Sequence, residues 1–305
     1  MVDYKDSGVD LEFAQKIPAI VKGLLKQQGV SGGSNIGGFG AAIKLAEDMY
    51  ISMACDGVGT KLMLAQKLGK YDTVGIDLVA MNVNDILCTG LYPKYFLDYM
   101  GFGDMEEDRF KQILSGIIQG CKESGSQLIG GESAQMTEVY GDKIDLVGFS
   151  MGMGRKKDLL NRSKVKEGDR IVGLPSSGLH SNGFSLVNLL IEKGDLPLGD
   201  ELLMPTKIYV KEFKRLRKRF HIKAAAHITG GGVHENLLRA VPPSRGIKLH
   251  YNWKVPEIFK RIQACGVDKN EMYRVFNMGI GFAFILSGGE STTLPEEYKI
   301  IGEVI

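Results

Sequence analysis

The chain has 305 residues, of which 44% are hydrophobic and 24% are charged, and its formal net charge is +2. This balance excludes a disordered chain and gives no reason to expect a nucleic-acid or membrane-surface partner. No apolar run approaches the roughly 20 residues of a membrane-spanning helix. Residues 1–10 are polar and do not resemble a secretory signal, so we expect a cytoplasmic protein.

The hydrophobic pattern predicts helices and strands that intermix along the whole chain. In the N-terminal half it predicts helices over residues 11–28, 77–89 and 109–121, and strands over residues 49–55, 94–100, 126–129 and 144–153. In the C-terminal half it predicts helices over residues 182–193, 207–220, 233–241 and 256–265, and strands over residues 170–174, 224–229 and 275–286. Such mixing predicts an α/β or α+β fold.

A charged stretch over residues 155–170 separates the two halves. We therefore expect two domains, residues 1–160 and residues 161–305. The basic segment 207–220 could be interpreted as a nucleic-acid surface. Its apolar residues at helical spacing favour a core helix with a solvated basic face instead.

Three glycine-rich turns indicate a ligand that carries phosphate. Turn 1 spans residues 32–40, turn 2 spans residues 176–183, and turn 3 spans residues 229–232. Turns 2 and 3 each follow a predicted strand and precede a predicted helix. Glycine lets several backbone N–H groups approach one ligand, and the start of a helix adds partial positive charge. None of the turns matches the P-loop or dinucleotide-binding patterns, so the pattern leaves the ligand open.

Four carboxylates lie at or beside apolar elements, namely Asp56, Asp85, Asp98 and Glu132. A buried carboxylate without a partner is costly, so each must be capped, paired or bound to a cation. Taken singly, a cap or an ion pair is the simpler interpretation; taken together, the four predict a shared cation. Oxygen ligands beside phosphate-binding turns favour Mg²⁺, and the four cysteines lack the spacing of a zinc site.

Two further side chains are candidates for chemistry. His180 lies in turn 2, where it could bind phosphate or transfer a proton. Lys61 closes the segment DGVGTK and could interact with a triphosphate. The alternative for Lys61 is a solvated lysine at the start of a helix.

These motifs resemble those of the phosphoribosylformylglycinamidine cyclo-ligase family. The resemblance runs through nearly the whole chain and covers DYKDSGVD at 3–10, GGFG at 37–40, DGVGTK at 56–61, GIDLVAMNVND at 75–85, FLDY at 96–99, GGE at 130–132, SSGLHSNG at 176–183, PTKIY at 205–209, HITGGG at 227–232 and EMYRVFNMG at 271–279. The chain departs from the family pattern at Cys55, where threonine is common, and at Gln135, where an acid is usual. Gln135 cannot act as an anionic ligand.

The resemblance implies two α/β domains, with the N-terminal sheets of two chains pairing across a homodimer into a β-barrel. It implies ATP-dependent closure of the imidazole ring of formylglycinamidine ribonucleotide in de novo purine biosynthesis, with Mg²⁺ as cofactor and ADP and phosphate released. It also implies that Asp56 and Asp85 bind the magnesium ion, and that the N-terminal domain binds ATP and forms the dimer.

We combine these inferences into one predicted site. ATP binding is assigned to Gly37, Gly38, Phe39, Gly40, Asp56, Gly57, Gly59, Thr60, Lys61 and Asp85. Binding of the substrate and its phosphate is assigned to Glu132, Ser177, His180, Ser181, Asn182, Thr229, Gly230 and Gly231. Catalysis is assigned to Lys61, His180 and Asp98.

Two other functions compete with this one. A selenophosphate synthase would need a reactive cysteine near the N-terminus, and residues 1–54 contain none. A non-catalytic nucleotide-binding subunit would predict loss of the pair Asp56 and Asp85, and both are present.

Overall fold

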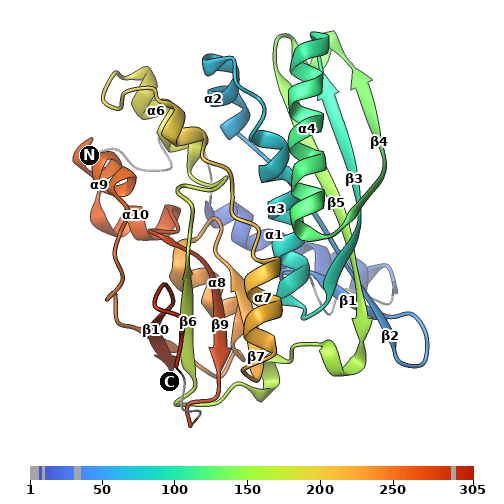
Figure 1. Cartoon of the computed structure of the whole chain (residues 1–305), viewed down its shortest axis with the longest axis vertical. Coiled ribbons are helices and arrows are strands. Elements are labelled where there is room, and N and C mark those ends of the chain that lie inside the picture. The colour runs from blue at the N-terminus through green and yellow to red at the C-terminus, as the bar shows by residue number, and fades with distance from the viewer. Residues whose placement is uncertain (1–6, 9–10, 31–35, 290–292) are drawn as a thin grey trace.

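The computed structural model describes residues 7–8, 11–30, 36–289 and 293–305 of the chain. Within these residues two five-stranded sheets form, one on each side of residue 160 in the sequence. Helices lie between the sheets and around them (Figure 1). The predicted two-domain α/β architecture is therefore confirmed.

The N-terminal sheet has the strand order β1-β2-β5-β3-β4. Its strands are β1 (Ala41–Lys44), β2 (Met49–Gly57), β3 (Tyr92–Phe102), β4 (Gln127–Gln135) and β5 (Ile144–Arg155). β3 and β4 are parallel, and the other neighbours are antiparallel. The helices of this half are α1 (Leu11–Gln27), α2 (Lys61–Leu68), α3 (Val74–Cys88), α4 (Glu107–Ser124) and the short α5 (Thr137–Tyr140).

The C-terminal sheet has the order β7-β9-β6-β10-β8 and is antiparallel throughout. Its strands are β6 (Arg170–Pro175), β7 (Ile222–His227), β8 (Ile247–Leu249), β9 (Ile280–Leu286) and β10 (Lys299–Val304). Its helices are α6 (Phe184–Glu192), α7 (Val210–Arg217), α8 (Gly232–Ala240), α9 (Glu257–Ala264) and α10 (Lys269–Val275).

Helix α3 is buried against the N-terminal sheet because glycines on β5 make room for it. A Cβ atom at Gly148 would lie 2.5 Å from the side-chain nitrogen of Asn82, and one at Gly152 would lie 2.3 Å from the side chain of Ile86. Both distances are shorter than packing allows, so α3 can approach only a strand that carries glycine here. α4 packs beside α3 on the same face of the sheet (Figure 1).

The opposite stripe of α3 faces the C-terminal domain. Asp77, Asn84 and Asp85 recur at helical spacing and each bonds to residues beyond position 180. The hydrophobic core is likewise continuous between the domains, since Leu78 of α3 belongs to the same cluster as Phe184 of α6. The two domains therefore share one packed interface, and α3 lies at its centre.

The structure corrects the predicted strand over residues 275–286. Residues up to Val275 belong to α10, and strand β9 begins only at Ile280. Between them Met278 and Gly279 adopt positive φ angles of 50° and 100°, which no strand contains. The side chain of Asn277 fixes this turn by accepting a hydrogen bond from the Gly279 N–H. Elements α2, β1, α5, β8 and α10 were missing from the prediction.

The basic side chains of α7 have partners within the chain. The guanidinium group of Arg217 donates to the carbonyl oxygens of Gly90 and Asp158, and Arg215 pairs with Glu297 at 2.9 Å. Arg217 thus ties α7 to the segment that joins the two domains. Across the part of the chain that the structure describes, none of the helices combines the length and the apolar character needed to cross a bilayer.

Candidate active site

Asp56 and Asp85, the pair that the family resemblance assigns to a metal ion, lie close together in the structure. Asp56 lies near the end of β2, and Asp85 lies in the last turns of α3. Burial, followed by the negative charge of Asp85, raises the pKa of Asp56 to about 6. The N–H of Gly57, which donates to Asp56 Oδ1 at 2.8 Å, acts against this shift. The two carboxylates are therefore close enough to repel each other.

The C-terminal domain supplies the partner of Asp85. His227, at the end of β7, places its Nδ1 atom 2.9 Å from Asp85 Oδ1, and its side chain is fully buried. The side-chain nitrogen of Asn84 lies 3.4 Å from the other ring nitrogen of His227. Sequence patterns could not identify this partner of Asp85, because it is 142 residues away in the chain. The acid pair is thus positioned by both domains.

Asp98 and Glu132 do not join this pair within one chain. Asp56 on β2 and Asp98 on β3 both pair with Gly148 on β5, so the whole strand β5 lies between them. Burial raises the pKa of Asp98, but no other carboxylate contributes to that shift. Glu132 is exposed on the edge strand β4 and accepts a hydrogen bond from the N–H of Ser133. The predicted cluster of four acids is therefore reduced to two.

Turn 1 is held against helix α8 by Arg239. The guanidinium group donates to the carbonyl oxygens of Gly37, at 3.2 Å, and Gly38, at 2.9 Å. It also lies 3.9 Å from the centre of the Phe39 ring, a distance suited to a cation–π contact. Residues 32–35 of the predicted turn lie outside the described residues, and Gly40 leads into β1.

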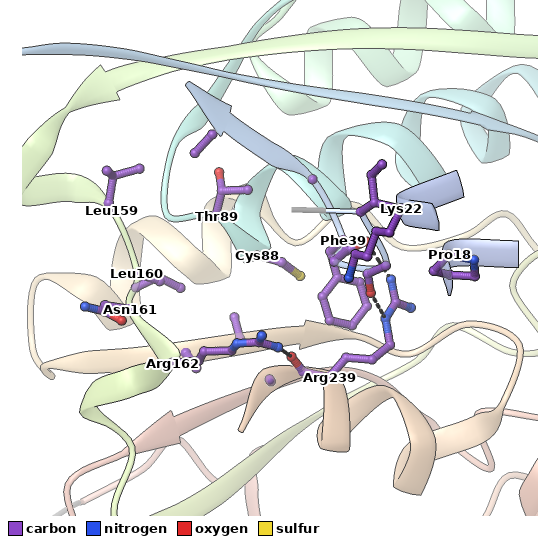
Figure 2. A pocket seen from close by; sticks show the side chains of 18 residues that line it. Pro18, Lys22, Phe39, Cys88, Thr89, Leu159, Leu160, Asn161, Arg162 and Arg239 are labelled. Atoms are coloured by element: carbon purple, nitrogen blue, oxygen red, sulfur yellow. Dashed lines mark hydrogen bonds between the residues drawn. The ribbon is translucent and has the colours of Figure 1, made fainter. Parts of the chain in front are cut away.

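A pocket of about 510 Å³ opens beside turn 1 (Figure 2). Its walls come from α1, turn 1, the end of α3, residues 159–162 and helix α8. Lys22, Arg162 and Arg239 give it three cationic side chains, and Cys88 lies one turn of α3 beyond Asp85. The positive charge of Arg239 acts weakly against the raised pKa of Asp56, so the pocket lies near the acid pair.

Turn 2 is shaped by two buried side chains. His180 is 1% exposed, adopts φ of 62°, and its Nε2 atom accepts a hydrogen bond from the Ser177 N–H. Asn277 donates to the carbonyl oxygens of Gly178 and Leu179. His180 therefore holds the backbone of the turn, and Ser177 is the exposed residue in it.

Turn 3 lies beside turn 2. A Cβ atom at Gly230 would lie 3.9 Å from the side-chain nitrogen of Asn182, and the side-chain oxygen of Asn182 is buried with no hydrogen-bond partner among the described residues. Gly231 has a φ angle of 94°, which favours glycine at that position. Thr229 donates a long hydrogen bond, 3.4 Å, to the side chain of Asn236. The predicted substrate residues of turns 2 and 3 are thus brought together.

Lys61 lies in a different environment from the predicted one. Its side chain is 0% exposed, and its ammonium group lies 2.7 Å from Asp77 Oδ2, 2.9 Å from the Met204 carbonyl oxygen and 3.1 Å from that of His180. Burial lowers the pKa of Lys61, and the charge of Asp77 opposes this shift. Its three donors are used inside the protein, so none is left for a triphosphate.

Asp77 lies beside the candidate site, and the sequence analysis did not single it out. Its Oδ1 atom accepts hydrogen bonds from the N–H and hydroxyl of Thr206, at 2.7 and 2.6 Å, and from the hydroxyl of Ser181, at 3.0 Å. We call Lys61, Asp77, Ser181 and Thr206 the domain lock. A charged residue near the start of the mostly apolar helix α3 was the available signal. Of the other predicted ATP ligands, Gly59 and Thr60 are exposed at the start of α2, and the Thr60 carbonyl accepts from Asn188 of α6.

The donor set beside Asp56 fits a magnesium ion. The charged form of Asp56 is disfavoured first by burial and then by repulsion from Asp85, and a cation would offset both. The side-chain oxygen of Asn82, on the same helix as Asp85, is buried with no hydrogen-bond partner among the described residues. Mg²⁺ is commonly held by one or two carboxylates plus substrate phosphates and water, so two carboxylates are sufficient. No group of three or more histidine, cysteine, aspartate or glutamate side chains forms a metal site within the described ranges.

The buried His180 predicts a pH-dependent stability. Burial, followed by the charges of His227, Lys61 and Lys207, holds the pKa of His180 well below its ordinary value of 6.5. The unfolded chain therefore takes up a proton near pH 6.5 that the folded chain excludes. This stabilising contribution is present above pH 6.5 and is lost as the pH falls below it, at up to about 1.4 kcal/mol per pH unit.

His180→Asn is expected to flatten this dependence, because asparagine cannot be protonated and tolerates positive φ. Urea unfolding at a series of pH values from 7.5 to 5.5, about one unit either side of the ordinary histidine pKa, measures the slope. His221→Asn, at an exposed position, is the matched control. A slope that His180→Asn leaves unchanged would contradict the prediction.

Two family models match this chain, one in each of the two domains. The family described as "AIR synthase related protein, N-terminal domain" matches residues 37–154, and "AIR synthase related protein, C-terminal domain" matches residues 166–305. A solved structure, "AaThiL complexed with AMPPCP and TMP", has a TM-score of 0.70 at 17% identity and covers 93% of this chain and 89% of that chain. That similarity concerns the fold alone.

Similarity in sequence is much higher to one group of enzymes. The phosphoribosylformylglycinamidine cyclo-ligase of Syntrophus aciditrophicus is 42% identical over 323 residues, covering 98% of this chain and 92% of that protein. The same enzyme of Pseudothermotoga lettingae is 45% identical over 318 residues, covering 98% and 94%. With both domains matched and nearly the full length covered, the chain belongs to the phosphoribosylformylglycinamidine cyclo-ligase family.

Proposed function

We propose that the chain catalyses the ATP-dependent ring closure of formylglycinamidine ribonucleotide to 5-aminoimidazole ribonucleotide, a step of purine biosynthesis, with release of ADP and phosphate. The observation that carries the proposal is the identity of 42–45% over 98% of the chain to enzymes of that name. The meeting of Asp56 and Asp85 beside the pocket at turn 1 supports it independently. A cytoplasmic location remains a prediction from the sequence.

The reaction needs a better leaving group than the formyl oxygen of the substrate. Transfer of the γ-phosphoryl group of ATP to that oxygen forms an O–P bond and releases ADP. The amidine nitrogen then attacks the activated carbon, the C–O bond breaks with loss of phosphate, and a proton leaves the ring. Positioning and charge stabilisation are the main tasks of a protein in phosphoryl transfer.

We assign the pocket beside turn 1 to ATP. Its cationic side chains Lys22 and Arg162 are suited to phosphate oxygens. Asp56 and Asp85 would hold the Mg²⁺ ion that accompanies ATP. When bound, that ion would neutralise charge on the phosphate oxygens.

We assign turns 2 and 3 to the ribonucleotide substrate. The backbone N–H groups around Gly230 are suited to its phosphate, and Asn182 is suited to its amide. The Ser177 hydroxyl donates to the Pro205 carbonyl oxygen at 2.6 Å and is therefore already bonded within the protein. Lys61 and His180 take structural roles in this proposal, because both are buried and bonded within the protein. Asp98 and Glu132 receive no role within one chain.

A coupled assay tests the function directly. The purified protein is incubated with ATP, Mg²⁺ and formylglycinamidine ribonucleotide, and the aminoimidazole product and ADP are measured together. We expect one ADP per product molecule. Hydrolysis of ATP without product, or no reaction with this substrate, would contradict the proposal. Omitting Mg²⁺ should abolish both products.

We further propose that the chain forms a homodimer through its N-terminal sheet. Helices α3 and α4 cover one face of this sheet (Figure 1). The other face carries apolar side chains that stay partly or fully exposed and lie side by side in the strand register, namely Met53, Cys55, Tyr95, Leu97, Tyr99, Val147, Phe149 and Met151. An apolar sheet face of this kind is suited to a second copy of itself, and pairing of two such sheets would give the barrel that the family resemblance implies.

Phe149→Glu places a charge at the centre of this face and is expected to give a monomer. Analytical ultracentrifugation at micromolar concentration measures the state, and circular dichroism verifies the fold. Lys111→Glu, on the exposed surface of α4, introduces the same charge away from the sheet and should leave a dimer. A wild-type monomer, or a dimer that Phe149→Glu leaves intact, would rule out this interface.

A further inference from the structure

One arginine connects turn 1 to turn 3. Arg239 binds the backbone of turn 1 through Nε and Nη2, and its remaining terminal nitrogen, Nη1, donates to Asn236 Oδ1 at 3.0 Å. Figure 2 shows its guanidinium group beside the ring of Phe39, within the pocket. A guanidinium group has a fixed planar array of donors, so these contacts constrain one another.

Asn236 links Arg239 to turn 3 through hydrogen bonds of its side-chain amide. It is 1% exposed, and its side-chain nitrogen donates to the carbonyl oxygens of Gly232, at 2.8 Å, Gly230, at 3.1 Å, and Thr229, at 3.3 Å. The amide group of Asn236 therefore closes turn 3 with its nitrogen and holds Arg239 with its oxygen. A continuous set of side-chain hydrogen bonds runs from Gly37 to Gly232.

We propose that Arg239 is a positioning residue that couples the two ligand sites. This inference rests on the proposed assignment of turn 1 to ATP and of turns 2 and 3 to the ribonucleotide. Residues 36–40 of turn 1 belong to no helix or strand, so holding them in one conformation for ATP costs conformational entropy. Arg239 reduces that cost by holding two carbonyl oxygens and the Phe39 ring. Substrate on turn 3 fixes Asn236, which fixes Arg239, and ATP then binds more tightly.

Calorimetric titration of a non-hydrolysable ATP analogue with Mg²⁺, with and without formylglycinamidine ribonucleotide, measures the coupling. In wild type we expect the ribonucleotide to tighten analogue binding by at least about fivefold. Arg239→Ala should weaken analogue binding about tenfold or more. In this variant the ribonucleotide should no longer change the affinity for the analogue. Asn236→Ala should preserve analogue binding in the absence of ribonucleotide and abolish the coupling.

A further variant and a control separate the effect of the positive charge of Arg239 from that of its hydrogen-bonding geometry. Arg239→Lys retains the positive charge near Asp56 but cannot bond both carbonyl oxygens and Asn236 at once, so the coupling should still be lost. Arg245→Ala, which removes an exposed ion pair with Glu167, is the control and should behave as wild type. If Arg239→Ala does not fold, Arg239→Lys and Asn236→Ala decide the question. Coupling that survives in these variants would overturn the inference.

Hydrogen exchange separates this inference from the proposed function. In the ligand-free protein, amides of residues 36–40 should exchange faster in Arg239→Lys than in wild type or Arg245→Ala. Unchanged exchange would overturn the positioning role whatever the enzyme makes. If wild type forms no aminoimidazole product while exchange responds as expected, the proposed function fails and the positioning of turn 1 by Arg239 stands.

Discussion

Asp85→Asn is expected to lower kcat about a hundredfold, equivalent to about 3 kcal/mol of transition-state stabilisation, while the protein stays folded. Asparagine retains the shape of the side chain and can still bond to His227 at the end of β7. It removes one of the two charges that would hold Mg²⁺ and ATP. The measurement is kcat against magnesium concentration for both proteins, with a thermal melt of each in chelator.

Asp195→Asn is the matched control, because Asp195 is an exposed carboxylate away from the acid pair. It should leave turnover and magnesium dependence unchanged. Near-wild-type turnover in Asp85→Asn, with the same magnesium dependence, would mean that Asp85 serves only to orient His227. In chelator we expect the variant to melt no lower than wild type, since it relieves the repulsion with Asp56.

Asp77→Ala is expected to destabilise the protein by about 3–5 kcal/mol, because it leaves the ammonium group of Lys61 buried and unpaired. Both side chains of this ion pair are 0% exposed. The same substitution removes the acceptor of two hydrogen bonds from Thr206. Urea unfolding at pH 7, followed by circular dichroism, measures the change.

Asp200→Ala is the control for Asp77→Ala, since it also breaks a lysine–aspartate pair between the two halves, with Lys70, but both of its side chains are at least half exposed. An exposed pair of this kind contributes about 0–1 kcal/mol. Adding Lys61→Met to Asp77→Ala should recover part of the lost stability, because it removes the unpaired charge. An equal loss from Asp77→Ala and Asp200→Ala would show that the domain lock does not stabilise the fold.

Local pattern was sufficient to predict most elements of this fold. Periodicity is a property of neighbouring residues, so the helices at α3 and α4 and the strands at β3 and β5 were predicted with ends only a few residues off. The apolar run over residues 275–286 misled the prediction because a short apolar segment has no period of its own. The turn at residues 276–279 is set by the side chain of Asn277 and not by hydrophobicity.

The candidate site was predictable only where its residues lie next to recognisable motifs. The apolar surroundings of the acids predicted a shared cation for four carboxylates, and only the family resemblance singled out Asp56 and Asp85 as a pair. Arg239 and Gly37 are 202 residues apart, and no periodicity connects them. Lys61 shows the opposite difficulty: its motif is conspicuous, but its burial depends on partners in the other domain.

The polar stripe of α3 has a consequence for protein engineering and for the exchange of gene segments. Asp77, Asn84 and Asp85 belong to one helix, yet their partners Thr206, Tyr209 and His227 all lie in the other domain. A hybrid that joins residues 1–160 of this chain to the second half of a relative would remove hydrogen bonds from all three side chains unless the relative carries matching side chains and backbone. Recombination at the boundary between the two sheets is therefore tolerated only between parents that match across this interface.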